Sequence, residues 1–258
     1  MVILTQPNKM RRISISRVGD EIVSQMLAVA IIAAWTIVHF ATIFGSAADN
    51  LAWHEIVIIV IIQAWLSTGL FIVAHDAMHG ALIPSRPRWN RAVGRLTLMI
   101  YAGLDYDRML PAHHQHHRDT GTPADPDFCA ANPRHPLKWF LHFFGNYYTH
   151  VQLARITVAA IAYMAMGAEL IDISIFWALP ALVALLQLFV FGTFLPHRHA
   201  DKAFIDHHNA RSGTGGFVSL VSCFHFGGYH HEHHLNPGTP WWRLPSLRQP
   251  FARPLPIR

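Results

Sequence analysis

The sequence predicts an all-α integral membrane protein, and three observations support this fold class. Apolar residues make up 52% of the 258 residues, whereas charged residues make up only 14%. A soluble domain usually carries about 25% charged residues, so the deficit indicates contact with lipid. Long uncharged segments alternate with polar ones, and many of the 20 histidines gather in three short clusters between those segments.

Four segments are apolar and long enough to be predicted as membrane-spanning helices, since about 20 apolar residues cross a bilayer. One of the four carries a charge, Arg155, close to its start, where a long side chain can reach the interface. Pro180 is expected to kink the last segment near one end. Residues 96–104 are also apolar but too short to cross, so we expect an interfacial or re-entrant segment there. The four predicted spans are residues 22–43, 56–74, 151–168 and 173–195.

The positions of the basic residues predict the topology. Four of them precede the first span and four follow the second, and none lies between Arg17 and Arg86. The connections at 44–55 and 167–172 carry acidic residues but no base, so the positive-inside rule places both outside. The chain is therefore expected to cross the inner (cytoplasmic) membrane several times as a single domain over residues 1–258.

In this topology residues 1–20 form a cytoplasmic tail, and the middle loop and both termini are also cytoplasmic. A Pro-rich segment at 237–258 is expected to be extended. The net charge of +5 is accounted for by these flanking basic residues, and nucleic-acid binding is not expected. Cys129 and Cys223 provide neither a disulfide framework nor a CxxC motif and are interpreted as two buried thiols.

The histidine clusters predict a metal site between helices at the cytoplasmic ends of the spans. They read HDAMH at 75–79, HHQHH at 113–117 and HHEHH at 230–234. Residues three or four apart share one face of a helix, so each cluster can direct two or three imidazoles at one point. Imidazole is the commonest protein ligand for transition metals. His114 lies outside the arc covered by His113, His116 and His117, so we expect it behind the ligands; His231 is left open.

The number of histidines favours two ions over one. A zinc ion takes three or four protein ligands, and the clusters offer at least eight. A carboxylate-bridged di-iron bundle would show Glu-x-x-His pairs, which are absent from the sequence. We therefore predict a histidine-rich di-iron site in a cytoplasmic helical cap.

Histidines outside the clusters are ranked by position. His197 follows the fourth span at the depth of the first cluster and is the preferred ninth ligand, while His225 is left open. Four aspartates could accept the outer N–H of ligating imidazoles, or could be solvated loop carboxylates: Asp76, Asp119, Asp201 and Asp206. The remaining histidines are interpreted as loop, surface or interface residues: His39, His54, His135, His142, His150, His199, His207 and His208.

The motifs HxxxH, HxxHH and HxxHH, separated by paired spans, resemble the membrane fatty acid desaturase and hydroxylase superfamily. Longer stretches are similar to the bacterial β-carotene ketolase (carotenoid 4,4'-oxygenase) family. One departure is Gly227-Gly228, where a single glycine is expected, and this leaves the role of His225 open. The stretches are HDAMHG from 75, HHRDTGT from 116 with DPDF from 125, FGTFLPHR from 191, FHFGGYHHEHHL from 224 and WWRLP from 241.

The resemblance implies an oxygenase with two Fe²⁺ ions and O2 as co-substrate. Electrons are expected from an external donor, a reduced ferredoxin, because no flavin, NAD or iron–sulfur motif is visible in the sequence. The implied reaction introduces keto groups at positions 4 and 4' of the β-ionone rings by successive hydroxylation. β-Carotene would give echinenone and canthaxanthin, and zeaxanthin would give astaxanthin. The implied iron ligands are His75, His79, His113, His116, His117, His197, His230, His233 and His234, with His225 as an additional candidate.

Two alternatives from other classes remain at this point. An acyl-lipid desaturase or hydroxylase would use the same iron scaffold. A non-catalytic metal carrier is less favoured, because a carrier needs polar ligands within the bilayer and here they lie at the ends of the spans. A ferredoxin-type donor is expected to dock on the basic face that includes Arg86, Arg88 and Arg91.

Overall fold

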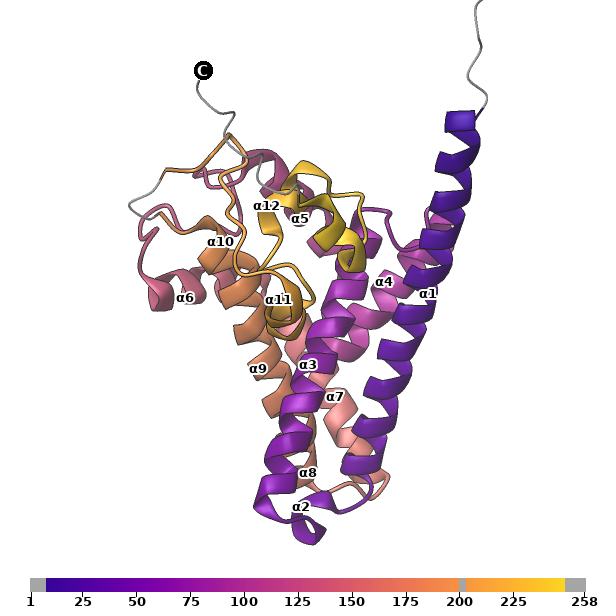
Figure 1. Cartoon of the computed structure of the whole chain (residues 1–258). Coiled ribbons are helices and arrows are strands. Elements are labelled where there is room, and N and C mark those ends of the chain that lie inside the picture. The colour runs from indigo at the N-terminus through magenta and orange to yellow at the C-terminus, as the bar shows by residue number, and fades with distance from the viewer. Residues whose placement is uncertain (1–7, 200–202, 249–258) are drawn as a thin grey trace, which may run out of the picture.

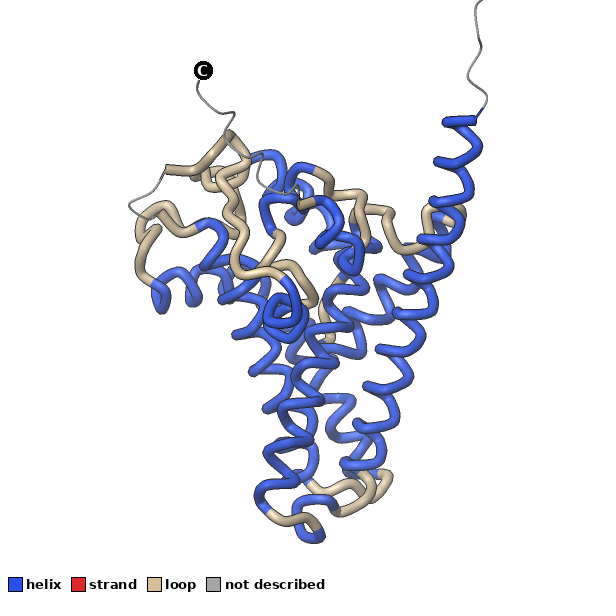
Figure 2. Tube along the Cα trace, viewed as in Figure 1, coloured by secondary structure: helices blue, strands red, loops and turns tan. Residues whose placement is uncertain are grey.

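The computed structural model describes residues 8–199 and 203–248. All regular secondary structure within these residues is helical (Figure 2). Long helices form a narrow bundle at one end, and shorter helices from the middle and C-terminal parts of the chain form a broader cap at the other (Figure 1). This arrangement agrees with the predicted all-α membrane fold.

Among the described residues, three helical segments are long and apolar enough to cross a membrane: Val18–Ile43, Trp53–Met78 and Leu170–His197. The first belongs to α1 (Asn8–Ile43), which begins within the predicted N-terminal tail. The second is α3 (Trp53–Met78), extended at both ends relative to the predicted span. Both helices carry apolar side chains without acidic or basic interruption over most of their length, as a lipid environment requires.

The third predicted span, residues 151–168, forms the shorter helix α7 (His150–Ala165). Its 16 residues correspond to about 24 Å at 1.5 Å per residue, less than the roughly 30 Å of a bilayer core. The helix is nevertheless attached to the bundle, because the Tyr163 hydroxyl lies 3.1 Å from His39 Nε2 of α1. Its passage across a membrane stays a prediction.

The third long segment is interrupted by two π-helical turns. It consists of α8 (Leu170–Ile173), η1 (Ser174–Ala178), α9 (Leu179–Gln187), η2 (Leu188–Phe194) and α10 (Leu195–His197). Pro180 follows the first π turn and Pro196 follows the second. Proline lacks a backbone N–H and its ring clashes with the preceding turn, so a widened turn accommodates it. The irregularity expected at Pro180 thus takes this form, and a second one occurs at Pro196.

The cap contains six further helical elements. Among them, α4 (Pro87–Ala102) includes residues 96–102 of the apolar segment 96–104 and packs along α3. Its Gly94 allows this approach, because a Cβ there would lie 2.4 Å from the Tyr106 ring and 3.0 Å from Ala77 Cβ. The others are α5 (Tyr106–Asp119), α6 (Pro136–Tyr147), α11 (Gly216–Cys223), α12 (His230–Leu235) and η3 (Trp241–Leu247).

Two expectations from the sequence are wrong. The segment from 237 is not extended throughout, because η3 forms a 3-10 helix that buries Trp241 and Leu244 against the bundle; residues 249–258 of that prediction lie outside the described residues. His39 is not a surface residue. It is fully buried and stacks on Trp35, with ring centroids 4.3 Å apart.

The two acidic connections meet at the end of the bundle opposite the cap (Figure 1). The short helix α2 (Ala47–Asn50) lies in the first connection, and the Ala48 backbone N–H donates to Asp172 Oδ1 in the second, at 2.8 Å. Both therefore lie on one side of the molecule and the histidine clusters on the other, as the distribution of basic residues requires.

Candidate metal centre

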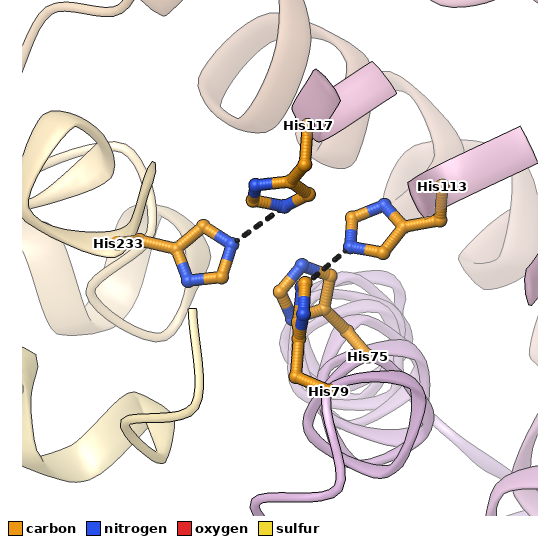
Figure 3. Close-up of side chains that lie close together, drawn as sticks. All are labelled: His75, His79, His113, His117 and His233. Atoms are coloured by element: carbon orange, nitrogen blue, oxygen red, sulfur yellow. Dashed lines mark hydrogen bonds between the residues drawn. The ribbon is translucent and has the colours of Figure 1, made fainter. Parts of the chain in front are cut away.

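Nine histidine side chains converge in the cap and form two groups. The first contains His75, His79, His113, His117 and His233, and the second contains His116, His197, His230 and His234. In each group the potential ligand nitrogens lie within 4.8 Å of one another. Figure 3 shows the first group, whose rings face a common centre from three directions.

Four elements supply these side chains. His75 lies in the last turns of α3 and His79 is its C-cap. The second cluster lies in α5, where Asp105 caps the N-terminus by accepting the backbone N–H of Asp107 and Arg108 at 3.0 and 3.2 Å. The third cluster lies in α12, and His197 ends α10. The two groups are adjacent, since the rings of His116 and His117 have centroids 5.6 Å apart.

The second and third histidine clusters each direct two imidazoles at one group, within the two or three that their spacing predicts, and the third imidazole of each lies in the other group. His113 and His117 face the first group, whereas His116 faces the second. In an α-helix, residues four apart differ by about 40° and successive residues by about 100°. The i, i+4 pair therefore shares one centre, and the third histidine reaches the other. In α12 the pair is His230 and His234, and His233 crosses to the first group.

Imidazole nitrogens approach one another closely within both groups. His113 Nε2 lies 2.7 Å from His79 Nε2, and His233 Nε2 lies 3.1 Å from His117 Nε2. In the second group, His230 Nε2 lies 2.8 Å from His197 Nε2 and 3.0 Å from His234 Nε2. Ligands at right angles around an ion with bonds of about 2.1 Å would be about 3.0 Å apart. The spacing suits nitrogens that share a metal ion.

Burial keeps most of these imidazoles neutral, which is their metal-binding form. Burial and the neighbouring His114 and His116 lower the pKa of His79 to about 3. Burial likewise holds the pKa values of His113, His233 and His234 well below the usual range. In addition, His75 Nδ1, His230 Nδ1 and His233 Nδ1 are buried without a hydrogen-bond partner among the described residues. Such an array is costly to bury unless a further group satisfies it.

His116 is the exception, because two carboxylates face it. Its Nδ1 lies 2.9 Å from Asp125 Oδ1 and 3.8 Å from Asp127 Oδ2. Burial lowers the pKa of His116, but the negative charges of Asp127 and Asp125 outweigh burial and raise the pKa overall. Asp125 is held in place by the backbone N–H groups of Gly121 and Asp127, at 2.8 and 2.9 Å. A proton on His116 Nδ1 leaves Nε2 free to face the second group.

A backbone carbonyl orients His197 in the same way. Its Nδ1 lies 2.8 Å from the Asn209 carbonyl oxygen, which can accept a proton held there. The Asn209 side chain in turn donates to the Thr120 carbonyl at 2.9 Å, which ties this loop to the end of α5. His197 is thus fixed at both nitrogens, although it lies outside the three clusters.

The aspartates considered from the sequence do not contact the two groups. Asp76 accepts the backbone N–H of Trp241, Asp119 pairs with Arg118, and Asp206 contacts His231 and His208. Asp201 lies outside the described residues. Asp125 takes the expected role instead. The signal that could have identified it is the DPDF stretch from 125, in which proline between two aspartates favours a turn in the loop that follows α5.

His225 is brought into neither group. Its backbone is left-handed, with φ of 71°, and its ring stacks on Trp241 with centroids 6.0 Å apart. Gly227 and Gly228, which follow Phe226, permit close packing. A Cβ at Gly228 would lie 2.0 Å from Ser219 Oγ, and one at Gly227 would lie 3.1 Å from Phe191.

The other cluster histidines lie outside both groups as well. His114 Nε2 is 3.1 Å from the Met78 carbonyl oxygen, and His231 Nε2 is 2.8 Å from Asp206 Oδ2. Two histidines from outside the clusters also lie apart from both groups: His208 contacts Asp206, at 3.1 Å, and His199 is an exposed residue beside Phe128. These side chains orient loops around the site and contact no ligand nitrogen.

A cavity adjoins both groups. Histidines of all three clusters form part of its wall, and most of the remainder is apolar, including Phe71, Met109, Phe143, Leu188 and Phe226. Asp127, Tyr147 and Thr193 add polar groups. The Tyr147 hydroxyl donates a hydrogen bond to Asp127 Oδ1. The cavity wall is therefore mostly apolar and adjoins both histidine groups.

Comparisons with known proteins agree with this arrangement. The sequence profile described as "Fatty acid desaturase" matches residues 51–157 and 146–256. A "Beta-carotene ketolase" of Paracoccus sp. (strain PC1) is 44% identical over 91% of this chain and 96% of its own length. A second one, from Paracoccus sp. (strain N81106 / MBIC 01143), is 46% identical over 87% of this chain and 92% of its own length.

The chain belongs to the β-carotene ketolase family. An algal member, a "Beta-carotene ketolase" of Haematococcus lacustris, is 32% identical over 89% of this chain and 80% of its own length. This ketolase-family chain is thus an oxidoreductase of the fatty acid desaturase type, and its two histidine groups lie in the part matched by the desaturase profile.

Proposed function

We propose that this enzyme introduces ketone groups at position 4, and then 4', of the β-ionone rings of β-carotene, giving echinenone and canthaxanthin. Zeaxanthin would give astaxanthin by the same reaction. The observation that carries the proposal is an apolar cavity walled by two groups of buried histidines in a chain of this family. A β-ionone ring is apolar and would reach such a cavity from the membrane.

The first histidine group would hold one Fe²⁺ ion and the second group the other, with His225 outside both sets. Bound iron would activate O2 for insertion into an unactivated C–H bond, chemistry that the protein's side chains cannot supply. The residues of the chain supply the remaining functions. Asp125 and the Asn209 carbonyl orient two ligands, and Phe71, Phe143 and Phe226 exclude water and align the ring.

We further propose that the cap and both termini face the cytoplasm and that α7 completes a fourth crossing. The basic residues in the first part of α1, before its apolar segment, and those that follow α3 support this orientation, since such residues remain on the cytoplasmic side. The contact of α7 with α1 supports the fourth crossing, as does the meeting of the two acidic connections at the end of the bundle opposite the cap.

The function is tested by expressing the chain in cells that accumulate β-carotene and analysing the pigments. Ketone-bearing products with red-shifted absorption are expected. A variant with His117→Ala and His234→Ala together should yield only the starting pigment, because each group loses a ligand. Unchanged pigment with the unaltered chain, together with altered fatty acids, would favour an acyl-lipid desaturase. That alternative has limited support, since an omega-6 fatty acid desaturase of Glycine max matches only 33% of this chain, at 28% identity.

We propose a reduced ferredoxin as the electron donor, docking on the exposed basic residues at the start of α4. Arg86 and Arg88 are exposed there, whereas Arg91 is paired with Asp107 and is less suitable for testing. Neutralising Arg86 and Arg88 together should raise the ferredoxin concentration required for half-maximal turnover and reduce its salt dependence. Unchanged kinetics at low salt would contradict this docking face.

A further inference from the structure

The second π turn, η2, contributes a polar group to the cavity wall. Leu188, Gly192 and Thr193 of this turn line the cavity beside histidines of both groups. π turns inside α-helices are rare and often occur at functional sites, since the extra residue redirects side chains. In η2 the residue with a polar side chain at the cavity wall is Thr193. The other two lining residues of this turn, Leu188 and Gly192, carry no polar side chain.

Thr193 behaves differently from the other buried threonines of the long helices. Thr42, Thr68 and Thr97 each donate to the carbonyl four residues earlier, at 2.8, 3.2 and 3.0 Å. This local bond is the usual way to satisfy a threonine hydroxyl in a helix. Thr193 is 6% exposed, yet its hydroxyl makes no hydrogen bond within the described parts of the chain. Its polar group is therefore available to a molecule in the cavity.

Two further polar groups line the same cavity. Tyr147 donates its proton to Asp127, so the phenolic oxygen can still accept a hydrogen bond. An alcohol has one proton to donate and lone pairs to accept with. The cavity thus offers a donor from Thr193 and an acceptor from Tyr147, which are the two partners that a secondary alcohol on an otherwise apolar molecule requires.

We propose that Thr193 binds the hydroxyl group of the alcohol formed by the first oxygenation and holds the same carbon in place for the second. This rests on the proposed function, in which one ring carbon is oxidised twice. Without such a contact the ring could rotate or leave after the first step, because an apolar wall makes no specific bond to the new hydroxyl group. Thr193 is in this sense a substrate-binding residue that determines the product.

The two steps balance as follows. In each, one O2, two electrons from the reduced ferredoxin-type donor and two protons convert one C–H bond into C–OH and release one water. After the second step the carbon carries two hydroxyl groups, and loss of one water gives the ketone. Thr193 contributes no electron and no net proton to either step, so its removal is expected to change the product and leave the overall chemistry intact.

The test compares variants by the ratio of 4-hydroxy carotenoid to ketone formed from β-carotene. Thr193→Val preserves shape but removes the hydroxyl, and the ratio should rise roughly three- to tenfold, the change expected for one neutral hydrogen bond. Thr193→Ser keeps the hydroxyl and should restore a low ratio. Thr97→Val removes a buried helical hydroxyl outside the cavity lining and should leave the ratio unchanged.

The outcomes separate this inference from the proposed function. If the unaltered chain forms neither alcohol nor ketone, the proposed function fails. If it forms ketone and Thr193→Val gives the same product ratio with bound iron retained, the role of Thr193 is refuted. The role is also refuted if Thr193→Val no longer uses zeaxanthin but accumulates no 4-hydroxy product from β-carotene. In that case the Thr193 hydroxyl would bind the hydroxyl group that zeaxanthin carries at position 3. Thr193→Ala, which cannot overpack, is assayed in the same way should Thr193→Val fail to accumulate.

Discussion

For single residues, the protonation state of each imidazole decides whether the site can hold a metal ion. Ligand histidines need an unprotonated nitrogen toward the ion and a fixed proton on the other nitrogen. Asp125 meets this need for His116, and the Asn209 carbonyl meets it for His197. Both ligands belong to the second group, which therefore depends on contacts from loops as well as from helices.

Replacement of Asp125 by Asn tests this dependence. The amide keeps the size of the side chain but loses the charge that favours a proton on His116 Nδ1. We expect iron affinity to fall by roughly 10- to 100-fold, the usual effect of losing such a partner. Iron per purified chain, measured across a chelator series, gives the result. Asp119→Asn, which affects a pair with Arg118 at the protein surface, is the control and should bind as the unaltered chain does.

The contrast between His197 and His225 gives a second residue-scale prediction. His197→Ala should lower the iron content toward one ion per chain, because the second group keeps only three histidines. His225→Asn should retain both ions, since His225 lies in neither group and Asn tolerates its left-handed backbone. Elemental analysis of both variants decides the matter. If His225→Asn lost iron and His197→Ala retained both ions, His225 and not His197 would be the ligand.

At the scale of helices, the site depends on how closely α4 and α5 approach α3. Gly94 allows this approach, because any Cβ there would overlap the Tyr106 ring and crowd Ala77. Ala77 lies between the first two ligands of the first group, and Tyr106 opens the helix that carries the second cluster. A small residue on α4 thus fixes the distance between two ligand-bearing helices.

Gly94→Ala should therefore destabilise the protein, although alanine is the better helix former. Overpacking of this kind costs about 1–3 kcal/mol, which exceeds the roughly 0.5–1 kcal/mol that alanine gains over glycine in a helix. Gly145→Ala in α6 is the matched control, because nothing lies within 4 Å of its added Cβ. Thermal unfolding in detergent should show a lower midpoint for the first variant only. A raised midpoint for both would mean that Tyr106 moves aside at little cost.

On the scale of the whole molecule, the histidines connect elements that are distant in sequence. Ligands of the two groups come from α3, α5, α10 and α12, so two bound ions would join the bundle to the cap at four places. α12 is only six residues long and follows a turn with two glycines. A short helix of this kind has little stability of its own, and its position depends on tertiary contacts.

Removal of the metal should accordingly lower the stability of the whole chain. A ligand present at a hundred times its dissociation constant stabilises the folded state by about 2.7 kcal/mol, so chelation should lower the thermal midpoint and re-addition of Fe²⁺ should restore it. Hydrogen exchange should show the largest loss of protection in α12. Equal midpoints with and without iron would indicate that the histidine groups are held together by protein contacts alone.

Much of this molecule could be predicted from its sequence. Three of the predicted spans correspond to helices able to cross a membrane, and the basic residues correctly placed both acidic connections at one end. Such features depend on local composition, since apolar length decides whether a segment can span lipid. The spacing of the three clusters was likewise sufficient to predict that histidines from all three converge.

The tertiary structure alone decided how these histidines are grouped. The sequence could not assign His116 and His233 to centres different from those of their cluster neighbours, nor decide the place of His225, nor identify the roles of Asp125 and Thr193. Each of these depends on the angle at which one helix meets another and on where a loop or π turn directs a side chain. Such angles are set by close contacts between residues far apart in the chain, as at Gly94 and Gly228, and local spacing does not encode them.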